Sequence, residues 1–247
     1  MSKYIINADD FGLSSNVNEA ILESFNLGLI SSTTVLANMP GFDDAVALSK
    51  HVVFQNRIGV HLNLFEGTPL TNEMRSCRVF SNENGDFHQE ALNFLGPYRM
   101  DKKIVFDELK AQISKVIDSG IKPTHLDSHA HRHTNIFVAH EVVRLSKYFN
   151  IPKIRLSGNV RNRNNYITGV KVFLFNLFLR VNDIKCTNYL GVIPDIVGSK
   201  NQLEGIVEVI VHPIYKNNIL SDLEYEGGLE ELLLTFKTDK LLSYYEI

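Results

Sequence analysis

Short β-prone runs alternate with amphipathic helical patterns along the chain of 247 residues. The first strand is predicted at 3–7, and the helix after it has apolar residues at i, i+3, i+4 and i+8 from Val17 to Phe25. This alternation favours a parallel sheet with helices packed outside it. The same pattern predicts further strands at 32–37, 58–64, 124–127, 153–156 and 206–211, and helices near 42–46, 101–119, 135–148, 170–180 and 229–238.

A barrel and an open sheet both satisfy this pattern, and the polar residues distinguish them. Side chains of catalytic type lie at or just past the ends of separate strands: Asp9-Asp10, His61, Asp127 with His129, and His212. A barrel gathers the carboxyl ends of its strands at one rim, whereas an open sheet spreads them along a line. We therefore expect an α/β barrel formed by residues 1–247 as a single domain, with a loop insertion at about 66–100.

Four of the nine histidines lie between His125 and His133. In an extended segment, His125, Asp127, His129 and His131 share one face. In a helix, His129 forms i,i+4 pairs with His125 and with His133. The strand predicted at 124–127 favours the extended geometry for the first half. The alternative for this segment is a solvated polar loop.

A metal site at the rim is the second expectation. One carboxylate and two imidazoles, from Asp10, His61 and His129, suit a divalent ion that keeps open positions for water and substrate. The two cysteines, Cys77 and Cys186, are far apart in sequence, which disfavours a closed zinc site or a disulfide framework. The alternatives are that an aspartate caps the following helix and that His61 is a hydrogen-bonded core residue.

Two further residues suit proton transfer. Adjacent carboxylates on a strand cannot both bind one ion equally, so one of Asp9 and Asp10 would bind the metal while the other handles protons. His212 ends an apolar strand and precedes Pro213, which places its imidazole at the strand mouth as a candidate general acid. A hydrogen-bonded residue at the end of a strand is the alternative for His212.

Composition excludes some partners. The net charge of −3 gives no electrostatic footprint for nucleic acid or an anionic membrane. The apolar run 170–179 is about half as long as a membrane span, and the N-terminus lacks a signal-peptide core, so we expect a cytoplasmic protein without a transmembrane segment. Within that run, Val170, Phe173, Leu174, Leu177 and Phe178 form a predicted core stripe, with a homodimer interface or a cover for a lipid-linked sugar as alternatives.

Four motifs occur in the order known for one family: Asn7–Ser14, Gly59–Leu64 with Gly67–Leu70, Pro123–His129, and Val211–Pro213. Together they resemble the YdjC-like carbohydrate deacetylases over nearly the whole chain. That resemblance implies a distorted (β/α) TIM-like barrel related to polysaccharide deacetylases, with its active site at the C-terminal rim of the strands. It also implies one bound divalent ion, Mg²⁺ or Zn²⁺, and removal of acetyl groups from N-acetylated oligosaccharides or glycoconjugates.

Carried over by position, the resemblance implies that Asp10, His61 and His129 bind the metal. It implies that Asp9 is the catalytic base and His212 the acid. His125, Asp127 and His131 are then expected to orient the ligands or to contact substrate. The family often has histidine at the position of Ala130, so substrate contacts could differ here.

Two other functions remain open from the residues. A metal-dependent phosphoesterase could also use His and Asp clusters at a barrel rim, but such sites often hold two or three ions. A non-catalytic carbohydrate-binding relative could keep the barrel. Asp9 and His212 disfavour this second alternative, because binding alone needs neither an acid nor a base.

Overall fold

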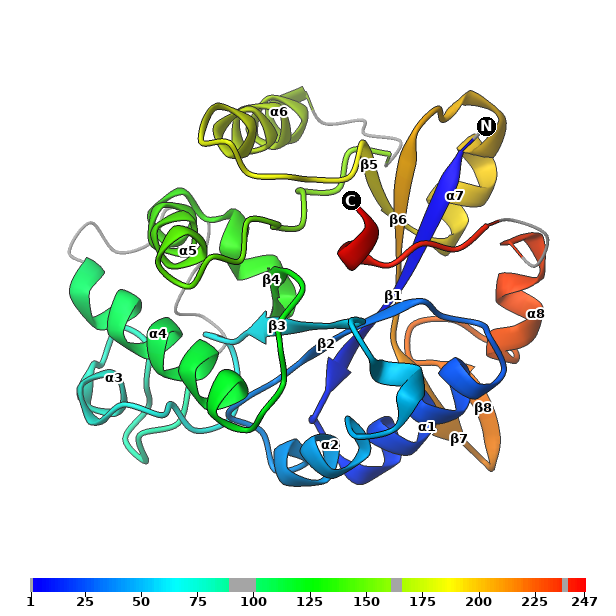
Figure 1. The fold of residues 1–247 in the computed structure, drawn as a ribbon. Helices are drawn as coiled ribbons and strands as arrows, with labels where there is room; N and C mark the ends of the chain where they lie inside the picture. The colour runs from blue at the N-terminus through cyan, green and yellow to red at the C-terminus, as the bar shows by residue number, and fades with distance from the viewer. Residues whose placement is uncertain (1, 89–100, 161–165, 237–239) are drawn as a thin grey trace.

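The computed structural model describes residues 2–88, 101–160, 166–236 and 240–247. In this part of the chain, six parallel strands form one sheet in the order β4-β3-β2-β1-β6-β5, beside an antiparallel hairpin, β7-β8 (Figure 1). The strands are β1 Lys3–Phe11, β2 Ser32–Val35, β3 Ile58–Leu62, β4 Leu126–Ser128, β5 Tyr189–Val192, β6 Ile206–Val211, β7 Pro213–Lys216 and β8 Ile219–Asp222. The helices are α1 Ser15–Asn26, α2 Phe42–Leu48, α3 Asn72–Ser76, α4 Lys102–Asp118, α5 Ile136–Tyr148, α6 Tyr166–Val181, α7 Ile193–Ser199 and α8 Leu229–Leu233.

The sheet curls into a distorted barrel, as predicted. The gap between β4 and β5 is bridged by single backbone contacts rather than by full strands. Leu126 pairs with Ile154, and Lys153 pairs with Lys185 in the segment that leads into β5. The amide of Ile154 donates to the carbonyl of Lys185 at 3.2 Å. The strand expected at 153–156 is therefore present only as these bridges.

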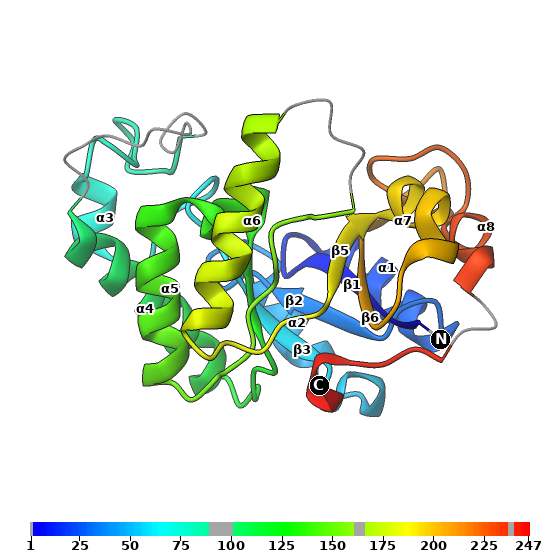
Figure 2. The same cartoon turned by 90° about the horizontal axis from the view of Figure 1, so that it is seen from above.

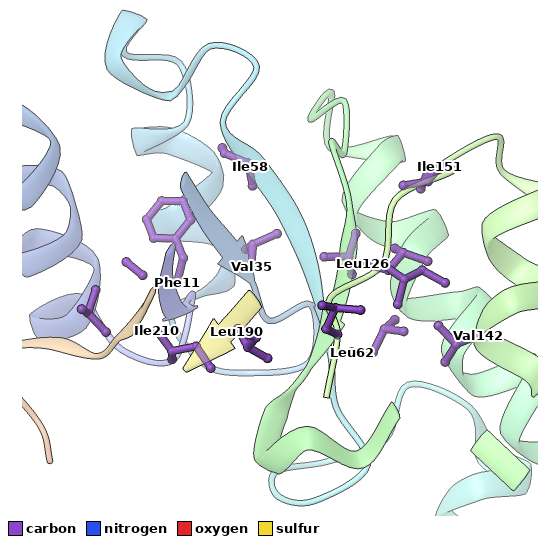
Figure 3. Packing of buried hydrophobic residues seen from close by; sticks show 14 of the residues in the cluster. Phe11, Val35, Ile58, Leu62, Leu126, Val142, Ile151, Leu190 and Ile210 are labelled. Atoms are coloured by element: carbon purple, nitrogen blue, oxygen red, sulfur yellow. The ribbon is translucent and has the colours of Figure 1, made fainter. Parts of the chain in front are cut away.

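Alternation along the strands separates an apolar outside from a polar inside. On β6, Val207, Val209 and Val211 are buried in the large core cluster, whereas Glu208 is buried among polar groups inside the barrel. Figure 3 shows that the cluster continues beneath the helices, from Phe11 on β1 to Val142 on α5. This layer supplies much of the hydrophobic stabilisation, and the interior holds charged side chains beside a smaller apolar cluster of Ile5, Leu242 and Tyr244.

Local signals set the ends of the helices. Ser14 caps α1 through its hydroxyl, which accepts from the amide of Val17, and Gly28 follows the helix with a φ of 69°. Asp101 caps α4 in the same way. The α4, α5 and α6 helices lie along one side of the barrel (Figure 2). The short α3 lies within the loop expected at 66–100, whose residues 89–100 lie outside the described part of the chain.

The prediction for α6 was wrong about its buried face. Phe175 and Leu179 are buried, whereas Phe173, Leu174 and Leu177 of the expected core stripe are exposed. Asn176 explains this orientation, because its side-chain amide accepts from the amide of Ser157 at 2.8 Å and donates to the Ser157 carbonyl at 3.0 Å. These two hydrogen bonds hold the side of α6 that carries Asn176 against the barrel.

None of the helices in the described ranges is both long enough and apolar enough to cross a membrane. The prediction missed β5, α7 and the β7-β8 hairpin. Each of these elements is short, with at most seven residues, and is too brief to show a clear period.

Candidate metal centre at the strand rim

A β-bulge near the end of β1 turns two adjacent carboxylates toward the same site. Ala8 pairs with Thr33 but Phe11 pairs with Val35, so β1 has one extra residue between these pairs. Asp10 takes up the irregularity with a φ of 71°. Adjacent side chains of a regular strand would point to opposite faces. Here Asp9 and Asp10 both approach Nε2 of His61, at 3.9 and 3.3 Å.

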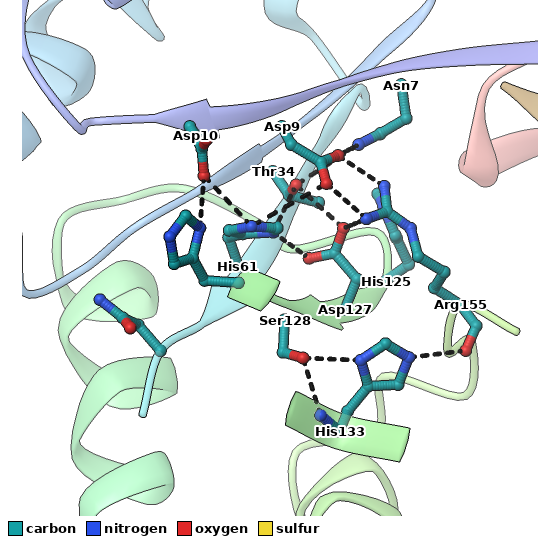
Figure 4. Close-up of polar contacts among 12 residues, drawn as sticks. Asn7, Asp9, Asp10, Thr34, His61, His125, Asp127, Ser128, His133 and Arg155 are labelled. Atoms are coloured by element: carbon teal, nitrogen blue, oxygen red, sulfur yellow. Dashed lines mark hydrogen bonds and ion pairs between the residues drawn. The ribbon is translucent and has the colours of Figure 1, made fainter. Parts of the chain in front are cut away.

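Possible metal-ligand atoms of three side chains converge at the strand ends, and Figure 4 labels two of these residues, Asp10 and His61. Asp10 Oδ1 lies 3.3 Å from His61 Nε2 and 2.8 Å from His129 Nδ1. These three residues form a group that could hold a metal ion, with the ligand atoms within 4.8 Å of one another. Asp9, His61 and Asp127 form a second such group.

Asp127 orients the imidazole of His61. Its Oδ1 lies 2.7 Å from His61 Nδ1, and its Oδ2 accepts from the hydroxyl of Thr34 at 3.0 Å. Asp127 thus holds the Nδ1 proton, and a metal ion would bind Nε2 by displacing the proton there, which is the usual arrangement behind a metal-bound histidine. Burial alone would lower the pKa of His61, but the carboxylates of Asp127 and Asp9 outweigh burial and raise this pKa to about 10.

Arg155 joins the carboxylates beneath this group. Its guanidinium donates to both oxygens of Asp9, at 2.6 and 2.7 Å, and lies 2.8 Å from Asp127 Oδ2. Its Nε donates to Glu208 at 2.8 Å, and the hydroxyl of Tyr244 donates to the other Glu208 oxygen at 2.5 Å. All five side chains are buried, so this network is shielded from solvent.

The charges of this cluster leave room for a cation. Burial opposes ionisation of Asp9 and Asp127, but Arg155 and His61 hold the pKa of both carboxyl groups below the ordinary value. Burial raises the pKa of Glu208 to about 7. Burial opposes ionisation of Asp10 too, but hydrogen bonds from His129 and His61 hold its pKa well below the ordinary value. Once a metal ion displaces the Nε2 proton of His61, three ionised aspartates of the described cluster face the single guanidinium of Arg155. The donor set and the excess negative charge both fit a bound metal ion.

His129 lies just beyond β4, in the 3₁₀ segment His129–Thr134. The next two residues, Ala130 and His131, have φ values of 48° and 53°. The chain therefore leaves the extended geometry, and only the first half of the cluster is a strand. Nε2 of His129 lies 3.1 Å from a carboxylate oxygen of Glu66, in the loop after β3. Glu66 thus closes the outer side of the site.

Two other histidines are buried supports. His125 stacks on the ring of Tyr244, with centroids 3.6 Å apart, and burial lowers its pKa to about 3. Gly59 allows this position, because a Cβ there would lie 2.5 Å from the His125 ring. His133 bonds to the hydroxyl of Ser128 at 2.6 Å, and burial lowers its pKa to about 3 as well. Both imidazoles are therefore neutral at physiological pH.

Two pockets adjoin the centre. His212 lines an apolar pocket of about 170 Å³ together with Asp9 and Asp10. The amide of His212 donates to Asp222 at 2.7 Å, which holds this residue at the start of the hairpin. His131 lines a larger pocket of about 520 Å³ at the ends of β5 and β6. The imidazole of His131 also interacts electrostatically with Asp9, His61 and Asp127.

The structure thus brings Asp9, Asp10, His61, Asp127 and His129 together, with His131 and His212 at the adjoining pockets and His125 beneath them. Sequence reasoning missed Thr34, Glu66, Arg155, Glu208 and Tyr244. One signal was available, because Glu208 is a charged residue in the middle of the apolar run Ile206–Val211. A charge at a buried strand position requires a partner.

The chain is similar to known proteins over most of its length. Residues 3–231 match the family described as YdjC-like protein. A carbohydrate deacetylase of Halalkalibacterium halodurans is 30% identical over 242 residues, which cover 93% of each chain. A carbohydrate deacetylase of Clostridium beijerinckii is 29% identical over 247 residues, covering 98% of this chain and 94% of the relative.

A solved structure shares the fold. The crystal structure of a putative cellobiose-phosphate cleavage protein from Enterococcus faecalis superposes with a TM-score of 0.74 at 22% sequence identity. The match covers 99% of this chain and 98% of that one. The likeness therefore spans the barrel and is not limited to one part of it.

Proposed function

Because this chain belongs to the family of YdjC-like proteins, we propose that it is a metal-dependent carbohydrate deacetylase that removes acetyl groups from N-acetylated sugars. The convergence of Asp10 Oδ1, His61 Nε2 and His129 Nδ1 at the strand rim carries the proposal. Relatives named carbohydrate deacetylase over most of their length support the substrate class.

In this proposal Asp10, His61 and His129 hold one divalent ion, Mg²⁺ or Zn²⁺. One carboxylate and two imidazoles leave further coordination positions free, as hydrolytic sites require. When bound, such an ion supplies a Lewis acid that polarises the amide carbonyl and lowers the pKa of water. Asp127 keeps His61 in the orientation that presents Nε2.

Asp9 is the proposed base. Arg155 donates hydrogen bonds to both carboxylate oxygens of Asp9 and holds the pKa of Asp9 low. The carboxylate is therefore ionised at neutral pH and able to accept a proton. The same two hydrogen bonds fix the direction of the carboxylate beside the donor set. A base fixed in this way needs no reorientation when water attacks the carbonyl carbon.

His212 is the proposed acid. His212 lines the pocket that Asp9 and Asp10 also line, so a substrate carbonyl placed there would have the proposed base and acid beside it. Attack by water breaks the amide C–N bond and releases acetate. The departing sugar nitrogen takes a proton from the His212 imidazole and leaves as an amine.

The larger pocket suits the sugar. Its wall combines hydrogen-bonding groups from His131, Ser157 and Asp195 with the ring of Tyr225. Its volume of about 520 Å³ is in the range of small-molecule sites. An N-acetylated oligosaccharide or the sugar of a glycoconjugate would be bound there.

The geometry favours one ion over the two or three of many phosphoesterases. Both candidate donor groups share His61. The second group is already engaged, because Arg155 binds Asp9 and Asp127. A second ion would have to displace this guanidinium.

Acetate release tests the proposal. The metal-loaded protein is assayed on a panel of N-acetylated oligosaccharides and glycolipids, and metal per chain is counted. We expect one ion per chain and acetate release that stops when a chelator removes it. His129→Ala should lower kcat/KM at least about hundredfold, because even residues behind metal ligands contribute 10- to 100-fold.

His140→Ala is the matched control, because the His140 side chain is 56% exposed on α5 and lies outside the cluster. It should leave acetate release unchanged. No metal-dependent acetate from any substrate would overturn the deacetylase proposal. Phosphate release with two ions per chain would favour the phosphoesterase alternative.

A further inference from the structure

The apolar pocket beside Asp9, Asp10 and His212 is larger than an acetyl group requires. Its volume is about 170 Å³. A water molecule occupies about 30 Å³ in the liquid, and a methyl group is of similar size. An acetyl methyl group in this pocket would therefore leave most of the volume unfilled.

The wall of this pocket is chemically unlike that of the sugar pocket. Apart from the catalytic groups and Ser14, it consists of Leu13, Val17, Pro213, Ile214 and Leu223. The hydroxyl of Ser14 is already engaged as the cap of α1. Such a wall offers nothing to sugar hydroxyls or to a phosphate, but it suits an aliphatic chain.

The pocket is held open by two elements that are tied together. The first turn of α1 forms one side and β7 the other, and the two pack against each other (Figure 1). The amide of Tyr215 donates to the side chain of Asn16 at 3.2 Å across this contact. At the mouth, the Leu223 side chain is 52% exposed, so a chain could extend past it toward solvent.

We propose that this pocket is an acyl-chain site, and that the enzyme removes linear acyl groups longer than acetyl, such as butyryl and hexanoyl, from amino sugars. This inference rests on the proposed function. Water adds to the acyl carbonyl carbon and the amide C–N bond breaks. The acyl group leaves as a carboxylate, and the sugar nitrogen leaves as an amine after taking a proton from His212.

The test is a series of glucosamine disaccharides that carry N-acetyl, N-propionyl, N-butyryl or N-hexanoyl groups. The metal-loaded enzyme is assayed for free amine and for the released acid. The kcat/KM for butyryl should equal or exceed that for acetyl, by up to about fourfold for each methylene buried. A kcat/KM for butyryl below that for acetyl would overturn the acyl-chain site and leave the deacetylase proposal intact. No release from any member of the series would overturn both.

The second part of the test uses a variant in which a larger side chain fills the pocket. Ile214→Phe should lower the butyryl-to-acetyl ratio of kcat/KM at least tenfold. The control is Ile219→Phe on the paired strand β8, where the side chain is 59% exposed and lies outside the pocket wall, and this variant should keep the ratio.

If Ile214→Phe does not fold, Leu223→Trp at the exposed mouth replaces it and should lower the same ratio. An unchanged ratio in a folded pocket variant contradicts the proposal, as does an equal fall of the ratio in Ile219→Phe.

Discussion

At the residue scale, the histidines divide by burial and by partner. His61 has carboxylates on both sides, so its pKa is raised to about 10. His125 is buried against Tyr244, and its pKa falls to about 3. The same side chain thus serves as a candidate ligand near the rim and as a neutral packing group lower in the barrel.

The lowered pKa of His125 predicts acid sensitivity. The unfolded chain protonates this histidine below about pH 6.5, whereas the folded protein does so only near pH 3. The unfolded state therefore binds more protons between these values, and stability falls as the pH drops through this window. His125→Phe should make the free energy of unfolding less steep, by about 1.4 kcal/mol per pH unit between pH 4 and 6.

Urea unfolding at several pH values from 4 to 7.5 measures how steeply the free energy of unfolding changes with pH in the wild type and in His125→Phe. The comparison between variant and wild type cancels the opposing contribution of Glu208, whose raised pKa acts in the other direction. Parallel slopes in the two proteins would rule out a neutral buried His125.

At the element scale, the bulge in β1 and the hydrogen bonds of Asn176 on α6 each decide which way an element points its side chains. The bulge in β1 turns Asp10 toward His61, although strand alternation would turn it away from Asp9. Asn176 fixes which face of α6 packs on the barrel. Neither effect follows from periodicity. A regular strand alternation contains no bulge, and α6 is apolar on both faces, so its pattern does not select the buried one.

The orientation of α6 predicts unequal losses of stability for two phenylalanine substitutions. Phe175→Ala should lower the free energy of unfolding by about 3–5 kcal/mol, because it opens a cavity in the core. Phe173→Ala should change it by less than about 0.5 kcal/mol, because the Phe173 side chain is 65% exposed. Denaturant unfolding of both variants measures the difference. A larger loss of unfolding free energy for Phe173→Ala than for Phe175→Ala would contradict this orientation of α6.

At the scale of the whole molecule, the C-terminal segment joins the interior of the barrel. Leu242 pairs with the backbone of Tyr4, and Tyr244 is buried against Ile5. From there the hydroxyl of Tyr244 donates to Glu208, and Glu208 accepts from Arg155. Arg155 in turn binds Asp9 at the rim, the last of these links and the one that Figure 4 shows. The segment around Tyr244 thus supports the Asp9 carboxylate of the first motif.

Removing this hydroxyl tests the connection. Tyr244→Phe should cost about 1.5–3 kcal/mol of unfolding free energy, because a buried carboxylate loses a hydrogen bond. It should also raise the pKa of Glu208 further. Tyr245→Phe is the matched control and should cost less than about 0.5 kcal/mol, because the Tyr245 side chain is 62% exposed. Thermal and urea unfolding compare the two, and equal losses would argue against the Tyr244 bond.

Much of the fold could be predicted, because its signals are local. The α1 and α4 helices end at capping residues and glycines, and β6 spans the run that was predicted. The strand-end positions of Asp9, His61 and His129 also follow from local pattern, since parallel strands place their carboxyl ends together. The β5, α7, β7 and β8 elements were missed because each is too short to show a clear hydrophobic periodicity.

The sequence by itself therefore determined the barrel and the rim on which the candidate residues gather. Only the tertiary structure decided which side chains support them. Arg155 meets Asp9 across 146 residues, and Tyr244 meets Glu208 across 36. Such pairs depend on strand register, on the bulge in β1 and on the curvature of the sheet. These features arise from packing between distant segments, so no local pattern records them.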